Sequence, residues 1–337
     1  MLQTLLEQSE IQLRTLMKQW EISGNLHSKQ DMVERLYKHL KDDDEWKKQW
    51  RAMHAGERML ALSISLDPRP SLNKFETKSL LPRSKQPEHA QTVERLLSLG
   101  LLFKQTHSDF FWMPVFIKKR LKRELRHSAY PWTIVSPNRS SVKMDAISDV
   151  ITWIDQLEED PLPLTKSYKI HKRDLKRTLS RFQHPEELPD EKWRFGYGRH
   201  FDAYPDRFSL LYDFCYRNKW IEEREGYLQV TKYAKQIDEW SASTFMKNLL
   251  KTYINIYRHA IPCLPFIVRW LQEITQPMEA IDKEWVKKEL QLFVDPFYFD
   301  GKSAVVEKRI LNMLEACNFL TTFHEDDDQY VYPTSWL

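Results

Sequence analysis

Glycine is scarce in this chain, at 7 of 337 residues. Loops that cradle phosphates need glycine wherever the backbone must approach the ligand closely. The sequence contains neither G-x-G-x-x-G nor G-x-x-x-x-G-K-S/T, and Gly196 and Gly198 have no third glycine to open a helix beside them. These absences argue against binding and hydrolysis of a nucleoside triphosphate by either common route.

Cysteine is rare too, and the three cysteines are never close together in the sequence. Cys215, Cys263 and Cys317 each stand alone in an apolar stretch, and no Cys/His spacing is typical of a metal site. We therefore expect three buried thiols in a reducing compartment, with no metal and no cofactor. No apolar run approaches the ~20 residues that span a bilayer, and the first residues lack the plan of a signal peptide. The prediction is a cytoplasmic protein without membrane contact.

Catalytic motifs are missing as well. The sequence has no H-E-x-x-H, G-x-S-x-G or H-x-E…P-C-x-x-C, and its 11 histidines are scattered. Glu284 and Lys287 lie three residues apart on an amphipathic stretch, which is the spacing of an ordinary surface pair on a helix. We expect a protein that is not an enzyme.

Apolar and basic residues are what the chain does have. It is 42% hydrophobic with 12 Trp, enough for folded cores over most of its length, and 337 residues suit two to four compact units. Residues 1–135 hold 23 Lys and Arg against 16 Asp and Glu, whereas 241–337 hold 10 against 13. A polyanion would be drawn to the N-terminal part.

One pattern recurs three times: an apolar helix, a helix-stop residue, and two short apolar strands around a polar loop. The copies cover 93–114, 210–230 and 310–333, with Gly100, Asn218 and Asn318 as the stop residues. Gly and Asn tolerate the left-handed backbone that ends a helix, and short strands around a polar tip are typical of hairpins. A helix running into a hairpin is the end of a winged-helix domain. We predict a mainly α fold with short β-hairpins (wings), in which three tandem winged-helix units follow an N-terminal helix-extended-helix module.

The expected boundaries follow from breaks in this pattern. The module takes 1–50, and the winged units take 51–135, 142–258 (including a bridging helix over 231–258) and 259–337. The Pro- and Ser-rich stretch 131–141 is the expected linker. Apolar periodicity predicts further helices over 53–66, 114–126, 144–158, 167–182, 207–217, 263–276, 280–293 and 302–317.

Residues 13–40 resemble a SAP motif, a small module that binds the DNA backbone. The resemblance is carried by Leu13, Leu16, Gly24, Lys29, Met32, Val33, Glu34, Arg35 and Leu36. Ser28 stands where the family usually has a second glycine, and it is expected to cap the second helix. The free N–H groups at that helix start, with Ser28, Lys29 and Arg35, suit a phosphate. The alternative is a capped helical hairpin that packs on the first winged unit.

Two basic runs suggest further contacts with phosphates. In the helix expected over 114–126, an apolar stripe leaves cations fanned over the rest, namely Lys118, Lys119, Arg120, Lys122, Arg123 and Arg126. The helix expected over 167–182 carries Lys169, Lys172, Arg173, Lys176 and Arg177, and Lys104 belongs to the first wing. Such faces bind the DNA backbone by releasing counterions. The alternative for the first run is a solvated surface helix.

The loops of the three hairpins differ in charge. The second is expected over Glu222–Glu225 and the third over Glu325–Asp328, and carboxylates there would repel phosphates. Only the first loop, 104–109, is neutral enough to lie on a DNA backbone. The third unit is therefore expected to bind a protein or to be architectural.

The order of elements from 51 to 337 is similar to the winged-helix region that accompanies superfamily 2 helicases of the xeroderma-pigmentosum-B type. The stretches 99–114, 162–179 and 220–240 carry this resemblance. The chain has no helicase motor, so the resemblance implies an accessory protein for a DNA-processing machine whose motor or nuclease is a separate protein.

The prediction is a non-catalytic, nucleoid-associated DNA-binding adaptor. Its N-terminal half holds duplex backbone, and its C-terminal half docks a protein partner such as a helicase or nuclease. Three alternatives remain: a plasmid- or phage-type replication initiator, a transcription regulator with a small-molecule pocket, and a pure protein-interaction scaffold. An initiator needs a basic final helix in two units, whereas 207–217 and 302–317 carry charge mainly at their ends.

Overall fold

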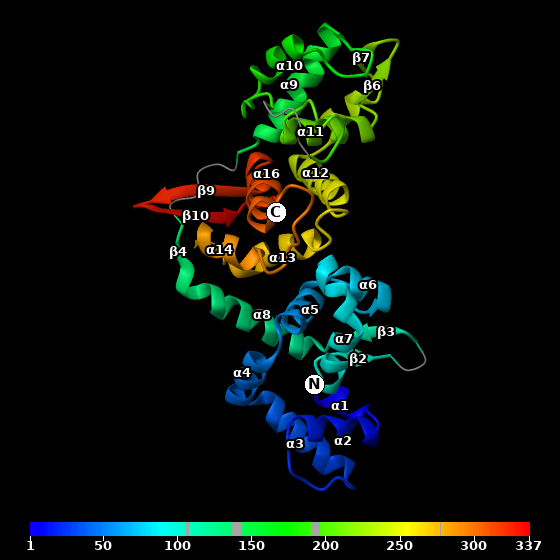
Figure 1. Ribbon diagram of the computed structural model, residues 1–337, viewed down its shortest axis with the longest axis vertical. Helices are drawn as coiled ribbons and strands as arrows, with labels where there is room; N and C mark the ends of the chain where they lie inside the picture. The colour runs from blue at the N-terminus through cyan, green and yellow to red at the C-terminus, as the bar shows by residue number, and fades with distance from the viewer. Residues whose placement is uncertain (106–107, 137–142, 190–195, 277) are drawn as a thin grey trace. The chain divides into compact units, whose positions relative to one another are not determined.

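The computed structural model describes residues 1–105, 108–136, 143–189, 196–276 and 278–337 (Figure 1). The chain is mainly helical with small antiparallel sheets of short strands, which confirms the predicted mainly α fold with short hairpins. It divides into two compact units, one of Met1–Pro131 with Pro265–Ile274 and one of Trp132–Leu264 with Thr275–Leu337. Within the described ranges, no helix has both the length and the apolar character that crossing a membrane requires.

The first unit contains most of its helices in one continuous stretch of chain. Its elements are α1 (Leu2–Leu6), α2 (Glu10–Gln19), α3 (Lys29–Lys41), α4 (Asp43–Ala52), α5 (Ala55–Leu66), β1 (Leu72–Asn73), α6 (Lys74–Ser79), the 3-10 helix η1 (Arg83–Glu88), α7 (His89–Ser98), β2 (Phe103–Lys104), β3 (Phe110–Trp112), α8 (Val115–Ala129) and most of α13 (Leu264–Ile274).

The N-terminal helices form as their sequences predict. Ser9 begins α2 with a capping box, and the Ser28 side chain accepts a hydrogen bond from Asp31 N at 3.2 Å at the start of α3. The apolar residues Leu13, Leu16, Met32, Val33 and Leu36 of the SAP-like stretch are buried. Trp20 Nε1 donates to Leu99 O at 3.0 Å. This bond fixes the end of α2 against the end of α7.

The second unit holds the remaining elements. They are the 3-10 helix η2 (Tyr130–Trp132) at its start, β4 (Thr133–Val135), α9 (Asp145–Glu159), β5 (Leu162–Pro163), α10 (Lys172–Leu179), α11 (Asp206–Arg217), β6 (Ile221–Arg224), β7 (Tyr227–Val230), the 3-10 helix η3 (Ala234–Glu239), α12 (Ala242–Tyr257), β8 (Glu279–Asp282), α14 (Lys283–Leu290), a continuous helix of α15 (Lys302–Ala304), the π-helical η4 (Val305–Leu311) and α16 (Asn312–Ala316), then β9 (Leu320–Glu325) and β10 (Asp328–Pro333).

The threefold repeat of a helix and a hairpin, predicted from the sequence, is part of a longer repeat in the structure. Three times the chain runs helix, strand, helix, helix, strand, strand: from α5 to β3, from α9 to β7, and from α13 to β10. Here η1 is counted with α7, and α15, η4 and α16 count as one helix. Each time the first strand pairs antiparallel with the last, giving the sheet orders β1-β3-β2, β5-β7-β6 and β8-β10-β9, the last extended by β4. The early strands β1 and β8 are the part of the repeat that the apolar pattern did not reveal.

Several local expectations differ from the structure. Lys219 takes the left-handed backbone after α11, with φ +59, whereas Asn218 has φ −78; Gly100 and Asn318 behave as predicted. The expected helix over 280–293 begins only at Lys283, because Glu279–Asp282 pair with β10 as strand β8 and Asp282 caps α14.

The other differences concern element lengths. The basic helix expected over 167–182 is shortened to α10 because a tight turn, with Tyr168 at φ +57, precedes it. The bridging helix expected over 231–258 is split into η3 and α12. Part of the expected linker forms β4, which pairs with β8, while 137–142 lie outside the described residues.

Candidate nucleic-acid interface

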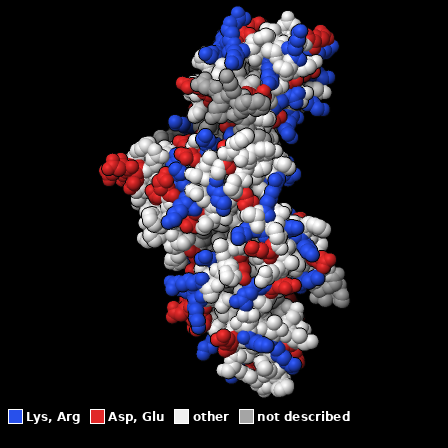
Figure 2. Space-filling view, in the orientation of Figure 1, with Lys and Arg blue, Asp and Glu red and all other residues white. Residues whose placement is uncertain are grey.

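The predicted cationic face of α8 is largely taken up by contacts inside the first unit. Figure 2 shows acidic and basic side chains side by side over α4, where Arg123 Nη2 lies 2.7 Å from Asp43 Oδ1. Lys118 Nζ donates to the carbonyl oxygen of Asp67 at 3.2 Å, and burial lowers the pKa of Lys118. Lys118 is thus partly buried, and Arg123 is exposed but paired.

Arg120 corrects the prediction most clearly, because its side chain is 5% exposed. Its Nη1 donates to Leu40 O and its Nη2 to Asp42 O, both at 2.8 Å, and Nη2 also contacts Asp43 Oδ1 at 2.5 Å. The guanidinium lies 4.8 Å from the ring centroid of Trp46. The planar fork of Arg120 thus joins α8 to the junction of α3 and α4.

The opposite side of α8 contacts α13. Lys122 Nζ lies 2.8 Å from Glu273 Oε2, and Arg126 Nη2 lies 2.6 Å from Glu273 Oε1. Of the six α8 cations predicted to bind DNA, Lys119 is the one without an ion pair or hydrogen bond within the described part of the chain. The basic run therefore braces α8 between two neighbouring helices.

The basic helix α10 keeps its cations at the surface. Lys172, Arg173 and Lys176 are exposed, while Leu175 and Leu179 are buried beneath them. Arg173 is 91% exposed and reaches only Asp174, at 3.5 Å; Lys172 and Lys176 have no ion pair to any described residue. Lys and Arg side chains gather over the region of α10 (Figure 2).

The flanking cations of α10 are paired. Lys169 forms an ion pair with Asp202, and Arg177 Nη2 lies 3.1 Å from Asp160 Oδ2. The three predicted contact residues that remain available, Lys172, Arg173 and Lys176, define what we call the α10 face.

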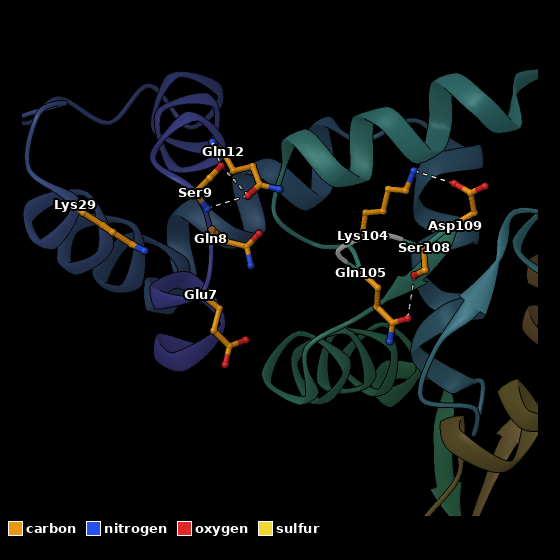
Figure 3. A pocket seen from close by; sticks show the side chains of 9 residues that line it. All are labelled: Glu7, Gln8, Ser9, Gln12, Lys29, Lys104, Gln105, Ser108 and Asp109. Atoms are coloured by element: carbon orange, nitrogen blue, oxygen red, sulfur yellow. Dashed lines mark hydrogen bonds and ion pairs between the residues drawn. The ribbon is translucent and has the colours of Figure 1, made fainter.

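Two other predicted cations, Lys29 and Lys104, line one groove of about 930 Å³ in the first unit (Figure 3). The other lining residues are Glu7, Gln8, Ser9, Gln12, Gln105, Ser108 and Asp109. Lys104 Nζ lies 2.9 Å from Asp109 Oδ1. Two cations and two carboxylates nearly cancel, so the groove attracts a polyanion only weakly. Thr106 and His107 of the first hairpin loop lie outside the described residues.

Ser28 and Arg35, the other two residues of the SAP-like stretch predicted to bind phosphate, make hydrogen bonds within that stretch. Ser28 caps α3, and Arg35 Nε lies 2.8 Å from Asp31 Oδ2 while its Nη1 donates to Ser23 O at 3.2 Å. Asp31 Oδ2 in turn accepts from Asn25 N at 2.8 Å. These bonds fit the alternative of a capped helical hairpin. Of the two cations of this stretch that were predicted to bind phosphate, Arg35 is paired and Lys29 has no ion pair to a described residue.

The helices that precede the hairpins offer little to a DNA groove. In α11, 8 of 12 residues are buried. In the helix of α15, η4 and α16, Arg309 is 6% exposed and pairs with Asp206 and Asp300, both at 2.8 Å. On α7, Gln91 and Glu94 are exposed, and Arg95 pairs with Glu57. No described residue arrangement supplies the basic final helices that a replication initiator needs.

The second hairpin loop is shorter than predicted, because Glu222 and Glu223 lie within β6. Glu223 points inward, where Arg199 donates to it at 2.8 and 3.1 Å and Tyr212 Oη donates at 2.8 Å. Burial raises the pKa of Glu223, but these hydrogen bonds outweigh burial and hold it below its usual value. The third loop is acidic at its tip as predicted, with Asp326 and Asp327 exposed between β9 and β10.

One buried ion pair in the second unit was not predicted from the sequence. Arg207 Nη2 lies 2.6 Å from Asp149 Oδ2, with both side chains at most 1% exposed. The only signal was a cation beside the apolar run Phe208–Leu211. The three cysteines are free and buried as expected, and burial raises the pKa of each thiol. Within the described ranges, no three His, Cys, Asp or Glu side chains come together as metal ligands would.

Comparison with known proteins identifies no family for this chain. No protein-family model matches it, and no curated protein matches it. Its function is therefore inferred from its own fold and surface.

Proposed function

We propose that the chain is a non-catalytic DNA-binding adaptor built from three winged-helix units. The order helix, strand, helix, helix, strand, strand, with the first strand paired to the last, supports the winged-helix assignment three times over. The adaptor holds duplex DNA by its backbone and docks a protein partner, such as a helicase or nuclease, through its C-terminal part. This role suits a protein associated with the nucleoid.

The α10 face is the observation that carries this proposal. Lys172, Arg173 and Lys176 lie on one exposed side of α10. Within the described ranges, Lys172 and Lys176 have no ion pair, and Arg173 reaches only the buried Asp174, at 3.5 Å. Exposed cations without carboxylate partners gain most from phosphates, because each contact releases counterions from DNA. By the same reasoning the α8 run contributes little, since all of its predicted contact residues except Lys119 already have partners.

The expected binding is independent of base sequence. Base edges are read by side chains that enter a groove, whereas phosphate contacts only position a protein. The helices before the hairpins are buried or carry no exposed cationic face among the described residues. We therefore infer contact with the backbone rather than with bases.

Fluorescence anisotropy with a labelled duplex tests the proposal. The variant Lys172→Ala/Arg173→Ala/Lys176→Ala is expected to lose about tenfold or more in affinity at about 0.1 M salt. The matched control, Lys247→Ala/Lys251→Ala/Arg258→Ala, removes the same charge from exposed positions on α12 and its end. The control is expected to keep the parent affinity. Equal losses in both variants would contradict a contact at the α10 face.

A pure protein-interaction scaffold is the second candidate. The partnered cations of α8 and the burial of α11 favour it. A scaffold would show no salt-dependent affinity for DNA, and the α10 face would then be an ordinary solvated surface. The anisotropy measurement separates the two candidates directly.

A further inference from the structure

The sheet β4-β8-β10-β9 has two different faces. On one face Leu320, Ile281 and Val331 are buried. On the other face Phe323, Tyr330 and Tyr332 are only half-buried. Opposite residues of an antiparallel pair share a face, so the pairing of Tyr330 with Phe323 places their rings together.

These rings form a small aromatic surface. Phe323 and Tyr330 are stacked with centroids 5.8 Å apart, and Tyr332 lies 6.1 Å from Phe323. The face of an aromatic ring carries negative electrostatic potential and attracts an ammonium or guanidinium group. The surface is thus suited to aliphatic chains that end in a cation.

Carboxylates surround this aromatic surface. Glu325 pairs with Asp328, two residues along the strands from the Phe323–Tyr330 pair and on the same face of the sheet. Asp282 lies opposite Tyr330 on β8. None of the three has an ion pair with a described residue, and acidic side chains gather at this hairpin tip in Figure 2. Partial burial, together with the negative charges of Asp328, Asp282 and Glu325, raises the pKa of Tyr330. The field here is negative.

The strand beside this surface is an edge. Among the described residues β9 is hydrogen-bonded to β10 on one side only, and it extends over six residues. An extended peptide can add to such an edge through its backbone, with alternate side chains directed to each face. Beside Thr321, Phe323 and Glu325, every second side chain of an added strand would meet the aromatic and acidic positions.

We propose that the β9 edge and its aromatic–acidic face bind an extended, lysine- or arginine-rich segment of a partner protein. This inference rests on the proposed function, because it specifies the partner that the C-terminal part would dock. Charge complementarity selects the occupant: a nucleic acid stacking on the same rings would bring its phosphates against Glu325 and Asp328 and be repelled. An apolar strand would leave those carboxylates unpaired.

Fluorescence polarisation with the full chain tests the inference. The probes are a short labelled peptide that alternates lysine with threonine and its counterpart that alternates glutamate with threonine. We expect the lysine peptide to bind and the glutamate peptide not to bind. Phe323→Ala should weaken binding about fivefold, because it removes one cation–π partner.

A second variant guards against misfolding of the first. Glu325→Gln/Asp328→Asn removes two charges without removing a ring, and it should weaken binding and flatten its dependence on salt. The matched control is Glu222→Gln/Glu225→Gln on the β6–β7 hairpin, which should bind as the parent does. Equal affinity in the variant and its control, no binding of the lysine peptide at low salt, or equal binding of both peptides would overturn the inference. The triple variant of the α10 face should keep its peptide affinity, so failure of DNA binding there is distinguishable from failure here.

Discussion

Glu186 stabilises the start of α11 from a distant loop. Its Oε1 accepts a hydrogen bond from Arg207 N at 3.2 Å, at a helix start where Pro205 offers no side-chain cap. Burial raises the pKa of Glu186 to about 7, against the attraction of Arg207. Arg207 forms its ion pair with Asp149, so burial dominates the pKa of the second carboxyl group, Glu186.

Replacing Glu186 with glutamine should change how stability depends on pH. Because the folded pKa lies above the ordinary value of 4.5, the stabilising proton is fully present below pH 4.5 and is lost as the pH rises through about 7. Relative to Glu186→Gln, the parent should lose up to about 3 kcal/mol of unfolding free energy between these limits. Urea unfolding of both proteins at acidic and slightly alkaline pH measures this difference. A constant difference across that range would contradict the shifted pKa.

Arg120 and its neighbour Lys119 should behave differently when truncated. Arg120→Ala leaves the carbonyls of Leu40 and Asp42 without their donor and should cost about 2–3 kcal/mol of unfolding free energy. Lys119→Ala, the matched control, is expected to change stability by less than about 0.5 kcal/mol. Thermal or urea unfolding gives both values. Comparable small effects from the two substitutions would refute a bracing role for Arg120.

At the scale of elements, the turn after α7 combines two demands in one residue. Gly100 has φ +65, and a Cβ there would lie 3.0 Å from Leu16 Cδ2 on α2. Gly226, between β6 and β7, has φ +83 but nothing within 4 Å of such a Cβ. An alanine at Gly226 would meet backbone strain alone, whereas an alanine at Gly100 would meet both backbone strain and a steric contact.

Gly100→Ala is accordingly expected to be the more harmful of the two substitutions. It should cost about 2–3 kcal/mol, of which the left-handed backbone contributes about 1 kcal/mol and the contact with Leu16 the rest. Gly226→Ala should cost only about 1 kcal/mol. Unfolding by urea measures both. Equal losses of unfolding free energy in the two variants would mean that Leu16 moves away from the added methyl group at no cost, and would contradict this prediction.

Helices and hairpins with strong apolar periodicity could be predicted from the sequence. The buried faces of α2 and α3, the three hairpins and the caps at Ser28 and Gly100 depend on residues close together in the chain. The strands β1 and β8 could not be predicted, because two to four residues carry no readable alternation and are defined by a partner strand far away. Lys219 shows the same limit: its left-handed backbone follows from how α11 meets β6, not from its own propensity.

For the whole molecule, the candidate site could be predicted only in part. Exposed Lys172, Arg173 and Lys176 were in the predicted set, yet so were the cations of α8. Arg120 meets Asp43 across 77 positions of sequence, and Lys122 meets Glu273 across 151. Local pattern reveals where cations are, whereas such distant pairings decide which of them remain available to a phosphate.

The most direct test of the DNA-binding account is the salt dependence of duplex affinity, measured by anisotropy for the full chain and for Lys172→Ala/Arg173→Ala/Lys176→Ala. Each lost phosphate contact should lower the slope of log affinity against log salt by about 0.9. The account predicts a steep slope for the parent and a slope lower by about 3 for the variant. No measurable affinity of the parent near 0.1 M salt, or the same slope in both proteins, would contradict it.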